Sequence, residues 1–321
     1  MCTPRTLIIG GGGMLGRAVA TRARLLGRDV HVPQNVPWSD PLLAVEALDE
    51  AVSEMISGDA TDWSIFWCAG AGTTATSETA FENEIRTFRS FIDRLTTKYS
   101  PYATNLTFFY ASSAGGLYAG SSNPPFTEAT PPSPISPYGH SKLTCERILP
   151  SLSDAGATVS IGRISNLYGP GQDVRKPQGL ISHICLAYHS GAISTLYTSL
   201  DTLRDYIFID DAAQLIIAFA DECTTNATNQ VTVKNIINGS SLSIAEIIGT
   251  ANAILKRPAP FLQVISHLTS LQARDLRLRS NVMPELDAFS KHSFPSGLMA
   301  TNIDIGHRFR AGETNSRSTT Q

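Results

Sequence analysis

Charged residues are scarce in this sequence, and their scarcity excludes two classes of protein. They make up 17% of the 321 residues, and the formal net charge is −3. A chain with so few charges and 42% hydrophobic residues does not repel itself into disorder. The small negative charge also gives no electrostatic reason to expect nucleic acid as a partner. We therefore expect a folded globular protein.

Long apolar runs and paired cysteines are scarce as well. No apolar run reaches the roughly 18 residues that a membrane span requires, so we expect no membrane association. The first residues lead directly into a short apolar run and four glycines, which is not the pattern of a secretory signal. The five cysteines are widely spaced, without a CxxC pair. These features predict reduced thiols, a cytoplasmic location and no metal site.

Short β-rich runs alternate with helical stretches over the first two thirds of the chain. This spacing predicts βαβ units with right-handed crossovers, and so an α/β fold with a doubly wound parallel sheet of the Rossmann type. We expect residues 1–168 to form this dinucleotide-binding domain. The expected strands are 6–9, 29–32, 63–68, 106–110 and 158–164, and the expected helices are 14–26, 41–56, 78–98 and 136–152.

The alternation becomes less regular after Gly169. We expect residues 169–311 to form mainly a smaller C-terminal substrate-binding lobe with interleaved Rossmann elements. Residues 312–321 are polar and are expected to be a flexible tail. The Pro-, Ser- and Thr-rich residues 119–137 predict a loop long enough to have a functional use.

A glycine cluster follows the first expected strand and opens the first expected helix. Gly10, Gly13 and Gly16 fit the spacing GxxGxxG, which permits a tight turn, close approach to a pyrophosphate and close packing of helix on strand. The helix begins at Met14 and Leu15, where backbone N–H groups face the phosphates. A flexible turn is the alternative, but the position between a strand and a helix favours a dinucleotide site.

An acidic residue is expected at the end of the second strand, where it would hold the adenosine ribose. This chain has Gln34 and Asn35 there instead. Either amide can hydrogen-bond a ribose hydroxyl, and neither repels a 2′-phosphate. The cofactor is therefore expected to be NAD or NADP, with the choice open.

Tyr138 and Lys142 are four residues apart on an expected helix, for which Ser136 suits the N-cap and Pro137 the first position. The two side chains share one helix face, so the ammonium favours the phenolate. Such a tyrosine can exchange a proton with a sugar hydroxyl or a ketone. An ordinary exposed pair is the alternative, and the upstream glycine cluster favours a functional one.

A serine at the carboxyl end of a parallel strand lies where ligands bind in such a sheet. Ser113 is the candidate here, with Ser112 as the close alternative. Its hydroxyl would hydrogen-bond the substrate oxygen that Tyr138 protonates. A serine that only caps the backbone is the competing interpretation for either residue.

These motifs occur in an order that resembles a known family. The three glycines, Ser113, the Tyr138/Lys142 pair, residues 161–172 and residues 203–211 follow one another along the chain. The chain thereby resembles the extended short-chain dehydrogenase/reductase family, in its NAD-dependent sugar epimerase/dehydratase branch. Jointly the motifs are highly specific, and the likeness fades after about residue 246.

The resemblance implies a hydride mechanism with Ser113, Tyr138 and Lys142 as the catalytic residues. The cofactor takes hydride from a sugar carbon while Tyr138 removes the hydroxyl proton, and a keto-sugar results. Lys142 would also bind the nicotinamide ribose. By the same likeness Asn166 would contact the substrate, and Arg204 would grip the diphosphate of a nucleotide sugar, unless it forms a salt bridge with a neighbouring aspartate.

Several positions depart from the family pattern. Ala69 and Gly70 lie in a glycine-rich stretch that we expect near the cofactor, whereas the preceding Trp67 replaces a usual histidine and is expected to be core packing. The stretch between Asn35 and Trp63 is short, so the third strand of the usual fold is expected to be reduced or missing. The family's 4,6-dehydratases carry an Asp-Glu pair where this chain has Ala114 and Gly115, which disfavours dehydration.

The leading hypothesis is therefore an NAD(P)-dependent nucleotide-sugar 4-epimerase. An NADPH-dependent 4-keto-sugar reductase is the alternative, motivated by the missing acid after the second strand. A 4,6-dehydratase and a non-catalytic cofactor-binding protein are less favoured. By resemblance we also expect a homodimer, paired through residues 78–98 and 136–152 in a four-helix bundle.

Overall fold

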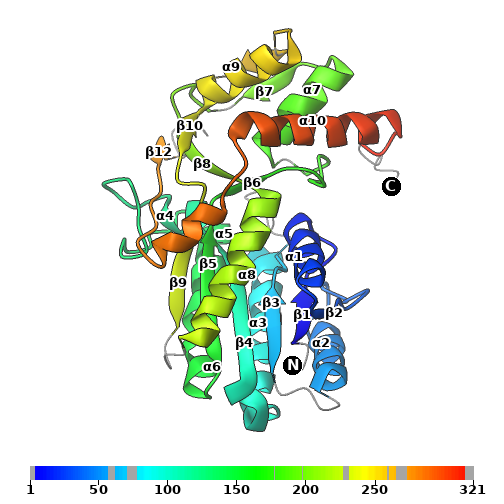
Figure 1. Cartoon of the computed structure of the whole chain (residues 1–321), viewed down its shortest axis with the longest axis vertical. Helices are drawn as coiled ribbons and strands as arrows, with labels where there is room; N and C mark the ends of the chain where they lie inside the picture. The colour runs from blue at the N-terminus through cyan, green and yellow to red at the C-terminus, as the bar shows by residue number, and fades with distance from the viewer. Residues whose placement is uncertain are drawn as a thin grey trace.

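The computed structural model describes residues 4–56, 62–70, 78–176, 178–196, 198–226, 231–258, 260–264 and 273–314. Within them, six parallel strands form a central sheet in the order β2-β1-β3-β4-β5-β9 (Figure 1). The predicted α/β fold with a doubly wound parallel sheet is confirmed. The strands are β1 (Arg5–Ile9), β2 (Asp29–His31), β3 (Trp63–Trp67), β4 (Leu106–Ser113), β5 (Thr158–Ile164) and β9 (Thr232–Ile236).

Helices cover both faces of this sheet. Leu7 and Ile9 point to the face covered by α2, α3 and α5, whereas Ile8 between them points to the face covered by α1 and α8. A strand buried on both faces needs a continuous apolar run, and this is the pattern that β1 has. The helices are α1 (Met14–Leu25), α2 (Pro41–Ile56), α3 (Glu78–Thr97), α4 (Ala114–Tyr118), α5 (Pro137–Ile148), α6 (Pro150–Asp154) and α8 (Ile209–Thr225).

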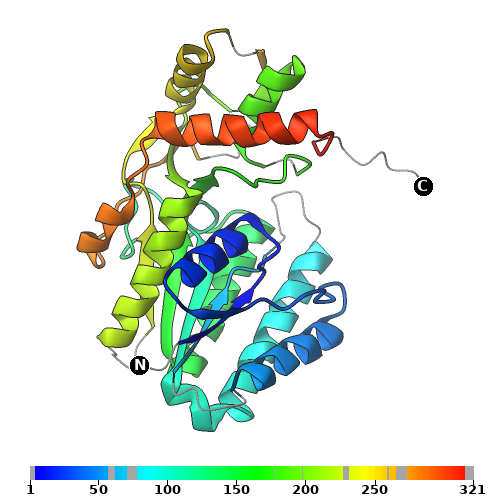
Figure 2. The same cartoon turned by 45° about the vertical axis from the view of Figure 1, so that its right-hand side comes forward.

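A smaller lobe lies beyond the carboxyl ends of the central strands, with α10 running across it (Figures 1 and 2). Its core contains Tyr168, Tyr206 and Phe208 together with apolar residues of α7, α9 and α10. β8 is its central strand and pairs with β6, β10 and β12. The elements are β6 (Asn166–Tyr168), α7 (Leu180–Ser190), β7 (Ser194–Leu196), β8 (Leu203–Phe208), β10 (Ser241–Ser243), α9 (Ile244–Leu255), β11 (Phe261–Gln263), β12 (Asp275–Leu276) and α10 (Phe294–Arg310).

The chain returns to the central sheet between elements of the lobe, because α8 packs against α1 and β9 pairs with β5. β6 precedes Gly169 and yet pairs with β8 of the lobe. The domain boundary between residues 168 and 169 therefore stays a prediction. Most of the predicted tail, residues 315–321, lies outside the described residues.

Two elements differ from the expectation. The helix expected over 136–152 is two helices, because Pro150 has no N–H to continue the hydrogen-bond ladder. The strand expected to end at Tyr110 continues to Ser113, which pairs with Ile164 of β5. The described residues 32–56, where the third strand of the usual fold is expected to be reduced or missing, form α2 and no strand, in agreement with the expectation. In the described part of the chain, no helix is long and apolar enough to span a membrane.

Candidate functional site

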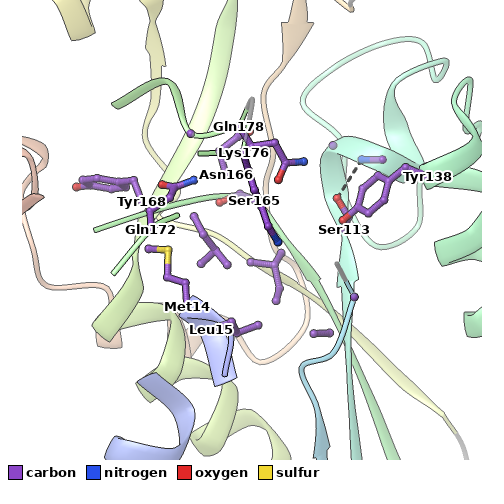
Figure 3. A pocket seen from close by; sticks show the side chains of 18 of the residues that line it. Met14, Leu15, Ser113, Tyr138, Ser165, Asn166, Tyr168, Gln172, Lys176 and Gln178 are labelled. Carbon is purple, nitrogen blue, oxygen red and sulfur yellow. Dashed lines mark hydrogen bonds between the residues drawn. The ribbon is translucent and has the colours of Figure 1, made fainter. Parts of the chain in front are cut away.

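A cavity of about 910 Å³ lies between the carboxyl edge of the central sheet and the lobe (Figure 3). Its size is typical of a ligand site, and this edge of an open α/β sheet is where ligands bind. Most of the predicted site residues line it. They are Gly13, Met14, Leu15, Ala69, Gly70, Ser113, Tyr138, Lys142, Asn166 and Arg204.

The glycine cluster has the shape that a pyrophosphate site needs. Gly10 has φ +88°, which permits the turn out of β1, and a Cβ at Gly16 would lie 2.3 Å from the Gly10 carbonyl oxygen. Gly10 and Gly16 therefore serve the turn and the close packing. A Cβ at Gly12 would meet no atom within 4 Å, so the loop faces open space before the N-terminus of α1. This cradle fits a dinucleotide phosphate.

Gln34 and Asn35 are not among the residues that line the cavity. The Gln34 side chain is exposed and donates a hydrogen bond to the Val32 carbonyl over 3.0 Å. Asn35 has φ +54° and is also exposed. Their role as ligands of the adenosine ribose stays a prediction.

Tyr138 and Lys142 lie on the first turns of α5, which has the predicted N-cap. The Ser136 hydroxyl accepts from the Gly139 N–H over 3.1 Å, and Pro137 occupies the first turn. The Lys142 ammonium lies 5.9 Å from the centroid of the Tyr138 ring. Lys142 is buried, and this burial acts to lower its pKa. The phenol of Tyr138 and the carboxylate of Glu84 outweigh the burial, so the pKa of Lys142 is raised.

The two candidate serines at the end of β4 have different partners. The Ser112 hydroxyl is buried and donates to Glu146 Oε1 over 2.6 Å. Ser113 is the N-cap of α4, and its hydroxyl accepts from the Gly116 N–H over 3.2 Å. A Cβ at Gly116 would lie 3.1 Å from Tyr138 Cε1 and 3.3 Å from Ser113 Oγ. Glycine thus lets the serine and the tyrosine lie side by side in the cavity, as Figure 3 shows.

A buried polar network stands behind this wall of the cavity. Arg163 on β5 pairs with Glu146 on α5, with Nη2 and Oε2 2.7 Å apart, and its Nη1 donates to the Tyr118 hydroxyl over 2.8 Å. Ser112 joins the same carboxylate. Glu128 in the long loop accepts from the Asn235 N–H, the Ser280 hydroxyl and the Asn281 N–H. The network fixes the loop and α5 to the sheet.

Arg204 and Asn166 lie on the lobe side of the cavity. Arg204 Nη1 donates to the Leu203 carbonyl over 2.8 Å, and the ion pairs of the described residues do not include it. Burial lowers the pKa of Arg204, although Tyr206 and Asp275 act in the opposite direction. The neighbouring Asp205 is turned away and accepts from two backbone N–H groups, so the alternative of a salt bridge with it is not observed.

Sequence reasoning missed a contact that joins the glycine loop to the lobe, which we call the clasp: Arg17, Gly171, Asp304 and Arg308. Arg17 donates to the carbonyls of Gly12 and Gly171, the latter over 2.8 Å. The Gly171 N–H donates to Asp304 Oδ2 over 3.0 Å, and Arg308 lies 3.4 Å from the same oxygen. These partners are far apart in sequence, so no local motif or spacing predicts the contact.

The cavity is strongly cationic, which sequence reasoning also missed. Its lining contains six cationic side chains and one carboxylate, that of Asp173. Low-dielectric walls with one sign of charge concentrate ligands of the opposite sign. The cavity therefore suits a ligand with several phosphates. The six cations are Arg17, Lys142, Arg175, Lys176, Arg204 and Arg308.

Comparison with known proteins gives a consistent result. The model of the NAD dependent epimerase/dehydratase family matches residues 6–234. The chain is 31% identical over 152 residues to a dTDP-4-dehydro-6-deoxyglucose reductase of Escherichia coli, which is 47% of this chain and 46% of that protein. It is 35% identical over 97 residues to a dTDP-L-rhamnose 4-epimerase of Burkholderia thailandensis, covering 30% of this chain and 27% of that one. The chain thus spans less than half the length of these curated relatives.

The solved structures match over almost the whole chain. The crystal structure of UDP-glucose 4-epimerase from Thermotoga maritima with UDP-glucose superposes with a TM-score of 0.79. It covers 96% of this chain and 99% of its own at 21% identity. At this identity the likeness establishes the fold alone.

Proposed function

Since the chain belongs to the NAD-dependent epimerase/dehydratase family, as its sequence predicted, we propose that it is a nucleotide-sugar 4-epimerase acting through a transient keto-sugar. One observation carries this proposal. Ser113 and Tyr138 face the same cavity as the glycine loop, whereas the positions of the dehydratase acids are Ala114 and Gly115. The site thus has groups for proton transfer at one hydroxyl, but it lacks the carboxyl pair that a dehydratase uses to eliminate water.

The residues of this wall would divide the work as follows. Tyr138 takes the proton of the sugar 4-hydroxyl and returns it to the keto oxygen, while Ser113 donates a hydrogen bond to that oxygen. Lys142 stays protonated and holds the phenolate form of Tyr138 in place. The nicotinamide dinucleotide, when bound on the glycine loop, supplies the chemistry that accepts and returns hydride. The net reaction inverts one carbon and consumes no cofactor.

The opposite wall would hold the nucleotide diphosphate. Arg204 presents a half-buried guanidinium that has no ion-pair partner among the described residues, which suits it to bidentate phosphate contacts. Asn166 is exposed to the cavity, although its amide already donates to the Asp205 carbonyl over 2.9 Å. The names of the relatives suggest UDP- and dTDP-hexoses as the first substrates to test.

A 4-keto-sugar reductase is the second candidate, for two reasons. The similarity to the Escherichia coli reductase is at 31% identity, and the end of β2 carries no acid that would repel the 2′-phosphate of NADPH. A reductase uses the same Ser113, Tyr138 and Lys142, but hydride flows one way and cofactor is consumed. A protein that binds cofactor without turnover is less favoured, because the whole catalytic set lines the cavity.

One experiment separates these candidates. The purified protein is denatured and the released nucleotide is identified, and the native protein is then given UDP- and dTDP-hexoses. Stoichiometric NAD together with interconversion of a 4-epimer pair supports the epimerase. An empty protein that prefers NADPH and oxidises it with a 4-keto-sugar supports the reductase. No interconversion across the panel with cofactor supplied overturns the epimerase proposal.

We also propose a homodimer and a cytoplasmic location. The four described cysteines are free, which fits a reducing compartment. The outward stripe of α3 is charged rather than apolar, with Glu82, Arg86, Arg89 and Asp93 exposed. A dimer through α3 and α5 would therefore rest on ion pairs and weaken with salt. Sedimentation velocity at about 0.05 and 1 M salt is expected to show dimers that dissociate at the higher concentration.

A further inference from the structure

An acidic side chain lies beside the candidate catalytic ammonium. Glu84 on α3 places Oε1 3.6 Å from Lys142 Nζ, and its side chain is 20% exposed. Both groups meet at Gly70, where a Cβ would lie 2.9 Å from Lys142 Nζ and 3.3 Å from Glu84 Oε1. Because Gly70 lines the cavity, the ion pair lies at the edge of the proposed cofactor site.

The ammonium has few other charged neighbours. Burial raises the pKa of the Cys68 thiol to about 12 and that of Cys145 to about 11, so both stay neutral. Tyr110 also stays neutral, because burial raises its pKa well above the ordinary value. The titratable groups that face Lys142 are Tyr138 and Cys145 on α5, Glu84 on α3, Tyr110 on β4 and Cys68 after β3.

The positive charge of Lys142 is therefore shared between two oxygens. One belongs to the Glu84 carboxylate, 3.6 Å from Lys142 Nζ, and the other to Tyr138, the proposed base. An anion beside the ammonium offsets part of the attraction that Lys142 exerts on the phenolate. Among the groups that raise the pKa of Lys142 against the effect of its burial, Tyr138 acts most strongly and Glu84 second.

We propose that Glu84 is a positioning residue that acts through Lys142: it fixes the ammonium beside Gly70 and sets the pH at which Tyr138 can take a proton. This inference rests on the proposed function, since it assigns Tyr138 as the base. The proposal predicts the direction in which the ionisation of Tyr138 shifts. Without the negative charge of Glu84, the attraction of Lys142 for the phenolate is no longer offset, so Tyr138 is expected to ionise at lower pH.

The direct test is a spectroscopic titration that needs no substrate. Absorbance near 295 nm is followed against pH, and the curve of the matching Tyr138→Phe protein is subtracted to isolate Tyr138. Glu84→Gln is expected to move the midpoint about one pH unit lower, the usual size for a close charge. Glu84→Asp keeps the charge at a shorter reach and is expected to move it less. The control Glu82→Gln removes an exposed charge from the outward stripe of α3 and is expected to leave it unchanged.

Turnover supplies the second readout. The acid limb of the pH profile of kcat is expected to move in the same direction in Glu84→Gln. The inference is overturned if the titration midpoint of Tyr138 and the acid limb of kcat in Glu84→Gln both match those of Glu82→Gln. A fall in activity alone would not support it, because a purely structural role lowers activity at every pH. If the Glu84→Gln chain does not fold, the Glu84→Asp midpoint decides instead.

The two proposals can fail separately. A shifted midpoint in a protein that turns over no nucleotide sugar supports the role of Glu84 and overturns the proposed function. Turnover of a nucleotide sugar with an unshifted midpoint supports the proposed function and overturns the role of Glu84.

Discussion

The two walls of the cavity are held in different ways. The wall that carries the proposed catalytic residues, formed by β4 and α5, is backed by buried side chains that bond to one another, with Glu146 and Arg163 at the centre. The lobe wall is held mainly by bonds between side chains and the backbone, such as those from Arg204 to the Leu203 carbonyl and from Arg17 to the Gly171 carbonyl. A buried network with every partner satisfied is rigid, whereas exposed single contacts give way at small cost. On the proposed function, proton transfer would therefore occur on the fixed wall and recognition on the adjustable one.

The largest expected effect comes from removing the base of the fixed wall. Tyr138→Phe is expected to lower kcat about 10²–10⁴-fold, the usual contribution of a general acid or base. Binding of NADH, measured by its fluorescence, is expected to stay near the wild-type value, because the glycine loop is untouched. Near-normal turnover would show that Tyr138 is not the general base, and the assignment of proton transfer to the fixed wall would then fail.

Breaking the network behind the fixed wall is expected to cost stability. Glu146→Gln leaves the buried Arg163 guanidinium without its charge partner, and such a loss typically costs about 3–5 kcal/mol in the free energy of unfolding. Chemical denaturation measures it. The control is Lys98→Ala, which breaks an exposed pair with Asp49 and is expected to leave the midpoint near wild type. Equal midpoints for both variants would contradict the rigid network.

The smallest effect is expected on the lobe wall. Arg204→Met is expected to raise KM for a nucleotide sugar about 10–100-fold, since hydrogen bonds to charged groups contribute about 1.5–3 kcal/mol, with kcat little changed. The control Arg277→Met removes an exposed guanidinium that is already bonded to Asp275 over 2.8 Å. A fall in kcat with an unchanged KM would place Arg204 among the groups that act only in the transition state.

Much of the sheet could be predicted because it obeys local rules. The buried run of β1 and the glycines after it lie next to each other in sequence, and α2 has its predicted bounds. Trp67 is 1% exposed, as expected for a core residue. The break between α5 and α6 also obeys a local rule, because Pro150 cannot donate the hydrogen bond that would continue the helix.

The contacts that shape the cavity could not be predicted in this way. β4 continues through Ser112 because the buried hydroxyl of this residue donates a hydrogen bond to Glu146, which lies 34 residues later in the chain. Glu84 and Lys142 are on different helices, and no spacing rule connects them. The cationic lining likewise contains side chains from α1, α5 and the lobe, which only the tertiary fold brings together.

The clasp has a consequence for how the protein folds. Arg17 and Gly171 are 154 residues apart, and Gly171 and Asp304 a further 133. Contacts of such high order close very large loops, and they form late in folding. We therefore expect the clasp, which joins the glycine loop to the lobe, to be completed only when α10 docks. Uptake of a dinucleotide during refolding would then mark the final step of assembly, well after the sheet has acquired its secondary structure.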